Sequence, residues 1–567
     1  MKDSSPKPSG LALVPLGVFA VFYVGLSLYA GNQGFEMPWY KVPYQPILAL
    51  ALLASFFLRT RRRLILRGLA MCVLCGAFGA PAAVSADGEL QEYAARTASR
   101  IAEIRATPNL QLPDGAVCRY LSERTGDDGN DGLTPATAWK TTARLDRERL
   151  APGTFVLFAR GGLYRGGFKA ASGVTYTAYG TGDKPRIYSS PENGADPARW
   201  RETEVPGVWA YPIGRLDVGT MVFNDGEAHA IKILPIYNDD GTYTQQYGKR
   251  PFDHGYADLA EDLHFWHDYS EKTDFKPFAK GTGLVYLRSR ENPGKRFRSI
   301  EFNVRKHGIA GGGATDVTID NLCIKYVGSH GIGFGTTKNL KVTNCEFGWI
   351  GGSIQAERIF GRKWAVRYGN AVEIYGGCEN YVVDNCYVYE VYDAGFTHQY
   401  NLNRPDEIKN MTNVRYANNV IARCNYSIEY FLSKVKPENP SLMDGFVICS
   451  NLMWHAGTGF CEQRPDLSQA AHVKSWCNWA NRAKDFVISD NVFCLSKAML
   501  IEAQNNLRNP DGSDSLPRLE RNVFISEKGG TFGLVCEGKP SRRPFDIQSI
   551  SEFLNTLGPG NVCHELP

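Results

Sequence analysis

The sequence predicts an all-β fold for most of the chain, a right-handed parallel β-helix in the form of a single-stranded solenoid, preceded by hydrophobic segments. Three observations favour this fold. A short alternating strand that ends in Asn recurs through the second half of the chain. Gly, Asn and Asp cluster between short apolar runs, where turns are expected. The 567 residues suit a solenoid, because each coil packs only against its neighbours.

The Asn at the end of each repeat explains how the coils would stack. Equivalent Asn side chains in successive coils can bond to one another and to adjacent backbone amides. A β-propeller could repeat on this scale, but single-strand units without hairpin turns favour the β-helix. The copies are 317–321, 340–344, 381–385, 414–419, 446–451 and 486–491, with Arg521 and Asn522 as a candidate seventh.

A second strand follows each Asn and carries the candidate site. One column of these strands is apolar and is predicted to point into the solenoid, so the next position points outward. The second strands are 330–334, 370–374, 394–398, 426–430 and 458–462. The apolar column is Ile332, Val372, Phe396, Ile428 and Phe460, and the outward column is Gly333, Glu373, Thr397, Glu429 and Cys461.

Glu373 and Glu429 are predicted to be a catalytic pair. With one coil between them, their backbones would be about 9 to 10 Å apart. An inverting glycosidase places its acid and its base roughly 6.5–9.5 Å apart, so that a water molecule fits between them. Asp393 or His398 on the intervening coil would tune one carboxyl group. The alternative for both Glu residues is a solvated outward face.

The same pattern predicts further residues of the site and leaves one of them ambiguous. His398 falls in the inward column, so either its strand kinks or the histidine is structural. Arg367 lies in a basic insertion, 351–368, whose charge would suit an acidic glycan. The residues predicted to bind substrate are His330, Tyr375, Gln399, Tyr400, Arg367, Glu462 and Trp476.

Composition excludes some functions. Sixty-three basic and 59 acidic residues leave a formal net charge of +4, so the positive surface of a nucleic-acid-binding protein is not expected. The chain has no HxxxH spacing, and no cofactor is predicted. Oxygen ligands cluster in 127–132, but the spacing is not that of an EF-hand, which favours a structural turn over a calcium site. Most of the 14 cysteines are expected to be buried fillers.

The N-terminus predicts export. The apolar run 11–30 is long enough to span a bilayer, and a second, 46–58, ends at an arginine cluster. Either these segments cross the membrane with the arginines inside, or 60–65 belongs to a twin-arginine signal with a cleavage site at 84–86. Both alternatives place the β-helix outside the cytoplasm, in the cell envelope.

The predicted organisation has five parts. Residues 1–86 form the membrane-spanning or export region, and a linker with a short helix follows. The parts after residue 86 are 87–115 for the linker, 116–300 for an N-terminal cap, first coils and an inserted β-rich segment, 301–530 for the β-helix core, and 531–567 for a C-terminal coil and cap.

Landmark segments occur in order along the chain: 120–122 and 125–132 with Pro135 and Trp139, 156–162 with 164–166, 284–287 with 292–293, 328–332, 368–373, and 393–395 with 398–399. Together they resemble bacterial right-handed β-helix repeat proteins of the pectin-lyase-like superfamily, which are related to glycoside hydrolases and polysaccharide lyases. The resemblance covers nearly everything after residue 115 and implies a carbohydrate-active β-helix. The chain departs from the polygalacturonase pattern, since it has no Asn-Thr-Asp and no Asp-Asp on successive coils.

Three functions are consistent with these patterns. The first is a glycoside hydrolase that cleaves a polysaccharide with Glu373 and Glu429 as its acid and base. The second is a polysaccharide lyase, in which His398, His330 or a basic residue of an insertion abstracts a proton beside a uronate. The third is a non-catalytic envelope protein that binds glycans or serves as a scaffold.

Overall fold

The computed structural model describes residues 86–274, 278–357, 361–404, 406–433, 439–476, 482–504, 516–536 and 542–566. The predicted hydrophobic segments before residue 86 lie outside the described residues. Within the described ranges, no helix combines the length and the apolar character needed to cross a membrane.

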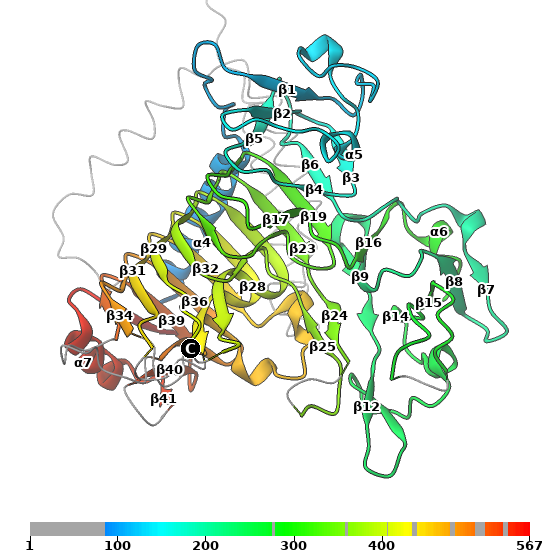
Figure 1. Ribbon diagram of the computed structural model, residues 1–567. Helices are drawn as coiled ribbons and strands as arrows, with labels where there is room; N and C mark the ends of the chain where they lie inside the picture. The colour runs from blue at the N-terminus through cyan, green and yellow to red at the C-terminus, as the bar shows by residue number, and fades with distance from the viewer. Residues whose placement is uncertain are drawn as a thin grey trace, which may run out of the picture. The chain divides into compact units, whose positions relative to one another are not determined.

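The described chain is a parallel β-helix whose coils stack in register (Figure 1). Its first face is a parallel sheet that begins near residue 118, before the predicted core, and continues past residue 515. Strand β21 (Thr337–Lys338) joins this face beside β27, and β34 (Arg482–Lys484) joins it beside β31. The strands of the face are β1 (Cys118–Leu121), β2 (Phe155–Ala159), β5 (Thr175–Tyr179), β18 (Thr318–Asp320), β22 (Lys341–Thr343), β27 (Cys378–Asp384), β29 (Met411–Ala417), β31 (Leu442–Cys449), β35 (Val487–Ser489) and β38 (Arg518–Glu520).

Two further faces share the long strands β28 (Tyr387–Asn401) and β30 (Val420–Ser433), each of which turns a corner. The first halves of these strands belong to the second face and the second halves to the third face. The other strands of the second face are β3 (Leu163–Arg165), β6 (Arg186–Tyr188), β19 (Cys323–Val327), β23 (Glu346–Ile350), β32 (Leu452–Ala456), β36 (Val492–Ser496), β39 (Val523–Glu527) and β42 (Val562–Leu566). Those of the third face are β4 (Phe168–Lys169), β17 (Ile309–Gly312), β20 (Ile332–Phe334), β26 (Val372–Tyr375), β33 (Ala471–Ser475), β37 (Met499–Gln504) and β40 (Thr531–Cys536), with β41 (Arg543–Pro544) antiparallel to β40.

The interior of the coils is apolar, as the alternation predicts. The third-face residues Ile332, Val372, Phe396 and Ile428 pair in one column and are completely buried. The prediction is wrong at the next coil, where Val473 of β33 occupies this column and Phe460 does not. Residues Gly459–Gln463 form a short 3-10 helix, η7, because the chain leaves the coil after β32 and returns only at β33.

The Asn residues of the repeat occupy two adjacent rows instead of one. Asn321, Asn344, Asn385 and Asn418 have φ near +55°, a left-handed turn conformation that Asn adopts more readily than most residues. The following row is buried and contains Cys345 and Cys386 in early coils and Asn in later ones. In the buried row each amide oxygen accepts from the backbone N–H of the preceding coil's residue. The Asn members are Asn419, Asn451, Asn491, Asn522 and Asn561.

The coils are interrupted between β6 and β17 by an inserted module (Figure 1). Because β5 pairs directly with β18, the solenoid continues across the interruption. The module contains a five-stranded sheet, a three-stranded sheet that includes β9 and β16, and a hairpin. Its elements are β7 (Arg201–Glu202), β8 (Val208–Pro212), β9 (Val218–Phe223), β10 (Ala228–His229), β11 (Ile231–Lys232), β12 (Pro235–Tyr237), β13 (Tyr243–Gln245), β14 (His264–His267), β15 (Leu284–Arg288), β16 (Ile300–Val304), α6 (Pro293–Arg296), η4 (Pro197–Arg199), η5 (Asn224–Gly226) and η6 (Gly255–Asp258).

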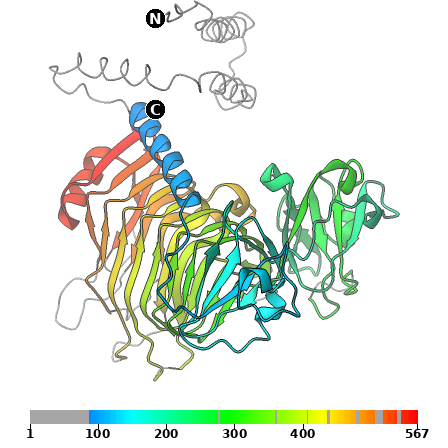
Figure 2. The same ribbon diagram turned by 90° about the horizontal axis from the view of Figure 1, so that it is seen from above.

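Helix α4 (Ala86–Arg105) lies along the second face, seen in blue in Figure 2. Its 20 residues span about 30 Å, which matches roughly six strand spacings. Arg105 makes two hydrogen bonds of 2.9 Å to Glu346 on β23, and Glu89 pairs with His564 on β42. Ile104 is completely buried against the second face. The helix therefore connects early coils to the last one.

Shorter elements complete the solenoid. Near its N-terminal end lie η3 (Pro135–Thr137) and α5 (Thr142–Leu145), beside the buried Trp139. Helix α7 (Ile547–Leu557) packs Ile550 and Leu554 against the core at the other end. These elements cover apolar side chains that the terminal coils would otherwise expose.

Replacing one member of the buried Asn row should destabilise the fold. In Asn491→Ala the backbone N–H and the side-chain amide of Asn451 both lose the oxygen that accepts from them, and the carbonyl of Ile448 loses a donor. Buried groups left unpaired cost about 1–3 kcal/mol each, so the free energy of unfolding should fall by about 2–4 kcal/mol in denaturant titrations. Asn413→Ala, at an exposed position of β29, should change the free energy of unfolding by about 1 kcal/mol or less. Equal losses in the two variants would contradict this account.

Candidate active site

A column of polar side chains points outward from the third face. The in-register pairs run from Gly333 to Glu373, Thr397 and Glu429, and then to Lys474 and Glu502. Glu373 and Glu429 have one strand between them, as the sequence predicts, so their backbones lie about 10 Å apart. Both carboxyl side chains are largely buried, with 5% of each residue exposed. They are not the solvated surface residues of the alternative interpretation.

The prediction that Cys461 continues this column is wrong. Because η7 replaces the expected strand, Lys474 takes the position next to Glu429. Glu462, predicted to bind substrate, is exposed and lies 3.6 Å from Lys497. Gly459 adopts φ +79° at the start of η7, a conformation that directs the chain away from the coil.

Glu373 is held as a carboxylate by three neighbours. His330 Nε2 lies 2.5 Å from one of its oxygens, to which the side chain of Asn370 also donates at 3.0 Å. The side chain of Gln399 donates to the other oxygen at 3.1 Å. Burial alone would raise the pKa of Glu373, but His330 and the two amide donors outweigh it and hold the pKa below its ordinary value.

His330 is predicted to bind substrate, but in the structure it orients Glu373. The backbone N–H of Asn370 donates to its Nδ1 at 3.1 Å, which leaves the ring hydrogen on Nε2, facing Glu373. The ring stacks on His307 with centroids 5.2 Å apart. Burial, together with the nearby His330, lowers the pKa of His307 to about 4, so His307 is neutral at neutral pH. The sequence reading missed His307 and Asn370, because neither stands out in a repeat.

Glu429 has a contrasting environment. The indole N–H of Trp476 donates to its carboxyl group at 2.6 Å. Burial and the nearby charge of Asp393 raise its pKa well above the ordinary value, although Trp476 and Arg464 act in the opposite direction. Trp476, predicted to bind substrate, therefore lies at the site as a direct partner of a carboxyl group. Glu429 is protonated under conditions in which Glu373 is charged.

Asp393 is the third carboxyl group of the site. It lies at the corner of β28, where the register with β30 shifts between residues 391 and 394. Arg464 donates to it at 2.9 Å from the segment that follows η7. Burial raises the pKa of Asp393, an effect that Arg464 opposes and the negative charges of Asp466 and Glu373 support. The pairing of residues 393 and 464 has no counterpart in the repeat, so the sequence pattern did not indicate it.

The prediction of His398 as a catalytic residue is wrong. Its side chain is completely buried in the solenoid core, next to the aromatic rings of Tyr416, Tyr430 and Phe446. The hydroxyl of Tyr416 lies 2.8 Å from its Nδ1. Burial lowers the pKa of His398 to about 3, so the ring is neutral. The strand continues in register from Phe396 to Asn401, and the inward position is structural.

The remaining predicted binding residues have different roles. Tyr375 is 44% exposed on the outward face, and its ring lies 5.1 Å from that of Tyr400. Tyr400 is largely buried and donates to Glu407 at 2.9 Å. Arg367 is buried, and its guanidinium donates to the carbonyls of Gly352 and Gly219. It joins the β-helix to the inserted module and does not present a charge to a ligand.

Insertions flank the site along the corner of the coils. The hairpin of β24 (Ser353–Ala356) and β25 (Val366–Tyr368) precedes β26, and the segment with η7 and η8 (Leu467–Gln469) precedes β33. Arg362 of the hairpin lies 3.8 Å from Asp466 of the second segment. Gln463 accepts a hydrogen bond from the backbone of Lys232 in the inserted module. The three insertions therefore contact one another.

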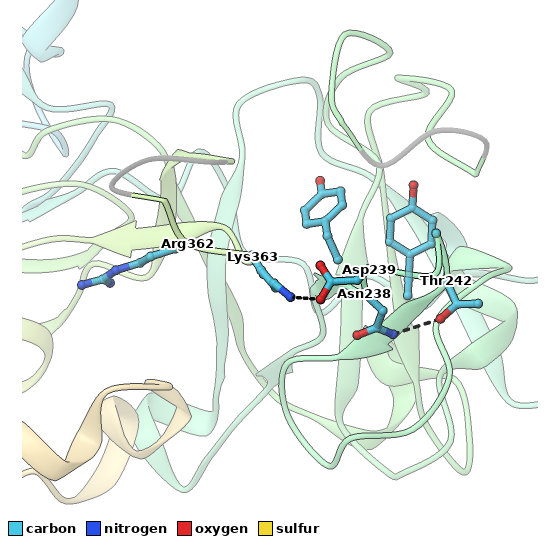
Figure 3. Close-up of a pocket in the computed structure, with 8 residues that line it drawn as sticks. Asn238, Asp239, Thr242, Arg362 and Lys363 are labelled. Carbon is cyan, nitrogen blue, oxygen red and sulfur yellow. Dashed lines mark hydrogen bonds and ion pairs between the residues drawn. The ribbon is translucent and has the colours of Figure 1, made fainter.

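A cavity of ≈ 380 Å³ lies between the inserted module and the β24–β25 hairpin. Figure 3 shows residues that line it. Lys363 pairs with Asp239 at 2.6 Å there, and Asn238 donates to Thr242 at 3.0 Å. The cavity does not include the carboxyl site. A second cavity of ≈ 420 Å³, lined by residues such as Arg215, Tyr269 and Arg305, also lies apart from it.

The described residues contain no cluster of three or more His, Cys, Asp or Glu that could hold a metal ion. In the 127–132 turn, which could have suited calcium, the carboxylates bond to the protein itself. Asp127 accepts from Gly129, Asp128 from Lys140 and Thr141, and Asp131 from Leu133 and Thr137. These bonds make the segment a structural turn, the interpretation that the sequence favoured.

No protein-family model matches the chain, and no curated protein matches it. Among solved structures, it is similar to one described as XylC with xylose, at 10% identity and a TM-score of 0.43 over 79% of this chain and 82% of that chain. A GH136 lacto-N-biosidase from Eubacterium ramulus is 14% identical with a TM-score of 0.31 over 79% and 68%. A polygalacturonase from Erwinia carotovora is 7% identical with a TM-score of 0.26 over 74% and 94%. These neighbours include glycoside hydrolases, the class that the sequence resemblance indicates, but at these values they say nothing about chemistry.

Because the pKa values of Glu373 and Glu429 are shifted in opposite directions, the two carboxyl groups should affect protein stability oppositely as pH changes. The raised pKa of Glu429 means that its contribution to stability is present below the unfolded-state pKa and is lost as pH rises through the folded-state pKa. The lowered pKa of Glu373 contributes stability above the unfolded-state pKa that is lost as pH falls. Between pH 5 and 9, Glu429→Gln should therefore gain thermal stability relative to wild type as pH rises, whereas Glu373→Gln should be less stable throughout.

Thermal unfolding of wild type and both variants across this pH range measures how the stability of each variant changes relative to wild type. Each unit of pKa shift between the folded and unfolded states corresponds to about 1.4 kcal/mol. Glu462→Gln, an exposed residue, serves as the control and should follow wild type. Parallel pH profiles for Glu373→Gln and Glu429→Gln would contradict the conclusion that the pKa values of the two carboxyl groups are shifted in opposite directions.

Proposed function

We propose that the protein is an inverting glycoside hydrolase with Glu429 as general acid and Glu373 as general base. One observation carries this proposal: two buried carboxyl groups, whose surroundings shift their pKa values in opposite directions, project from the same column with one strand between them. Perturbed pKa values of opposite sign at neighbouring carboxyl groups are typical of an acid and a base at one active site. The spacing of the strands supports the inverting class.

Each carboxyl group has a distinct part in the reaction. Glu429 protonates the glycosidic oxygen as the bond to the sugar breaks, and Glu373 removes a proton from the attacking water on the opposite side of the ring. His330, Asn370 and Gln399 keep Glu373 charged and fix its orientation. Burial and the nearby Asp393 raise the pKa of Glu429, which favours the protonated form that a general acid needs.

Thr397 supports the position of the water. Its side chain lies in the column between the two Glu residues, and it is completely buried. Its hydroxyl has no hydrogen-bond partner among the residues that the structure describes. Because a buried hydroxyl needs a partner, the attacking water or a sugar hydroxyl between the carboxyl groups would satisfy it.

The structure offers less support for the lyase alternative. His398 is inside the core, and both ring nitrogens of His330 are engaged by Glu373 and by a backbone N–H. Neither histidine is placed to remove a proton from a substrate. We also propose that the enzyme acts in the cell envelope, on the basis of segments that precede the described residues.

The hydrolase proposal predicts that Glu373→Gln and Glu429→Gln each lower kcat/KM for an unactivated glycan by a factor of roughly 10³ or more, as expected for loss of a general acid or base. The full-length protein is screened with a broad panel of polysaccharides by reducing-end release. The new anomeric configuration is then read by proton NMR. Glu462→Gln is the matched control and should keep full activity.

Substrates with different leaving groups distinguish the general acid from the general base. An aryl glycoside with a good leaving group needs little protonation, so Glu429→Gln should recover most of its activity on it while Glu373→Gln stays inactive. Retention of configuration, or an unsaturated product that absorbs in the ultraviolet, would overturn the proposal.

A further inference from the structure

The arrangement of charges around the carboxyl site bears on its substrate. Resting on the function proposed above, we infer that the site binds uncharged sugar residues and rejects uronic acids. Among the residues that the structure describes, the cationic side chains nearest the site are already paired within the protein, whereas two hydroxyl groups at the site have no hydrogen-bond partner. This is the reverse of what the basic insertion 351–368 suggested from sequence.

Arg464 is the cation closest to the carboxyl cluster, and it is occupied by two carboxylates. It donates to Asp393 at 2.9 Å and to Asp466 at 3.0 and 3.3 Å. Its side chain is 9% exposed and lies over the rings of Tyr392 and Tyr426. A carboxylate of a substrate would have to displace one of these acids to reach it.

The other cations are engaged in the same way. Lys474 of the outward column pairs with Glu502 of the next coil and lies 3.9 Å from the centre of the Trp476 ring. Arg362 lies 3.8 Å from Asp466, and Lys409 lies 3.5 Å from Glu407. Arg367 is buried with its guanidinium on backbone carbonyls. Within the described residues, these pairs leave the site without a prepared receptor for a substrate anion.

A uronate would also meet the negative charge of the site. The surroundings of Glu373 lower its pKa and favour the carboxylate, and the carboxyl group of Asp393, to which Arg464 donates, lies at the same corner. An added carboxylate would be repelled by both and would have no desolvated cation to offset the repulsion. Recognition of a uronate normally places arginine or lysine opposite its carboxylate.

The groups that lack partners are uncharged. The hydroxyls of Thr397 and Tyr426 are buried and have no hydrogen-bond partner among the described residues. Tyr426 contacts the site through Arg464 and through Trp476, whose ring lies 6.3 Å away. Hydroxyl groups of a neutral sugar both donate and accept, so they can satisfy both side chains. The exposed ring of Tyr375, two residues from Glu373, offers an apolar face for the C–H groups of a sugar.

The test compares matched ligands that differ only in charge. Oligosaccharides that contain uronic acids and their carboxyl-reduced counterparts are titrated against the full-length protein by calorimetry, across several backbone linkages, and cleavage is followed in parallel. For every pair in which binding is detected, we expect the neutral oligosaccharide to bind at least 10-fold more tightly than the uronate. Tyr426→Phe should weaken the binding of the neutral ligand about 10-fold. Equal or tighter binding of the uronates would overturn the inference.

A variant that removes one carboxylate near Arg464 tests whether the paired cations are the reason that uronates are rejected. Asp466→Asn removes a carboxylate that Arg464 and Arg362 share, so it should raise the ratio of uronate to neutral affinity about 10-fold. Glu462→Gln removes the same charge from an exposed position close in sequence and should leave the ratio unchanged. An unchanged ratio in Asp466→Asn would contradict the role assigned to these pairs.

The outcomes distinguish this inference from the hydrolase proposal. Hydrolysis of uronate-containing oligosaccharides that depends on Glu373 and Glu429 would support the hydrolase proposal and contradict the inference that the substrate is uncharged. Preferential binding of neutral ligands without cleavage of any would sustain the inference about the ligand and overturn the hydrolase. Failure of every pair to bind would overturn both.

Discussion

The in-register hydrogen bonding of parallel strands is the constraint on which the rest of this structure depends. It repeats the backbone about every 4.8 Å along the stack, so a side chain in one coil always meets the equivalent side chain in the next. The buried Asn row follows from this spacing, because each amide can reach the backbone of the neighbouring coil. The same spacing sets the separation of Glu373 and Glu429. Stability and site geometry thus share one origin.

Within that regular frame, the chemistry comes from irregular segments. The column alone would place two equivalent Glu residues on one face. Glu373 becomes a stable carboxylate because Asn370 on its own coil and His330 on the preceding coil both contact its oxygens. Glu429 differs because Trp476 is its donor and Asp393 is its neighbour, and the long return from η7 brings Arg464 to Asp393. Departures from the repeat therefore make two identical residues different in charge.

The sequence predicted what the repeat encodes. The paired apolar column and the outward positions of Glu373 and Glu429 follow from alternation within short strands, which is a local property. The coil after β30 was misread because 458–462 also alternates, while its actual strand begins only at Ala471. His398 remained ambiguous, since one position in a strand cannot distinguish a core histidine from a catalytic one. The pairing of Arg464 with Asp393 depends on how a long insertion folds back, and no sequence periodicity records that.

Helix α4 has a mechanical consequence. It immediately follows the N-terminal residues and contacts strands from β23 to β42, so a pulling force applied through those residues would enter the solenoid from its side. The load would act in shear on several coils at once, whereas a tether at an end coil would peel strands away one at a time. A domain loaded in this way would resist unfolding better than one pulled from an end coil.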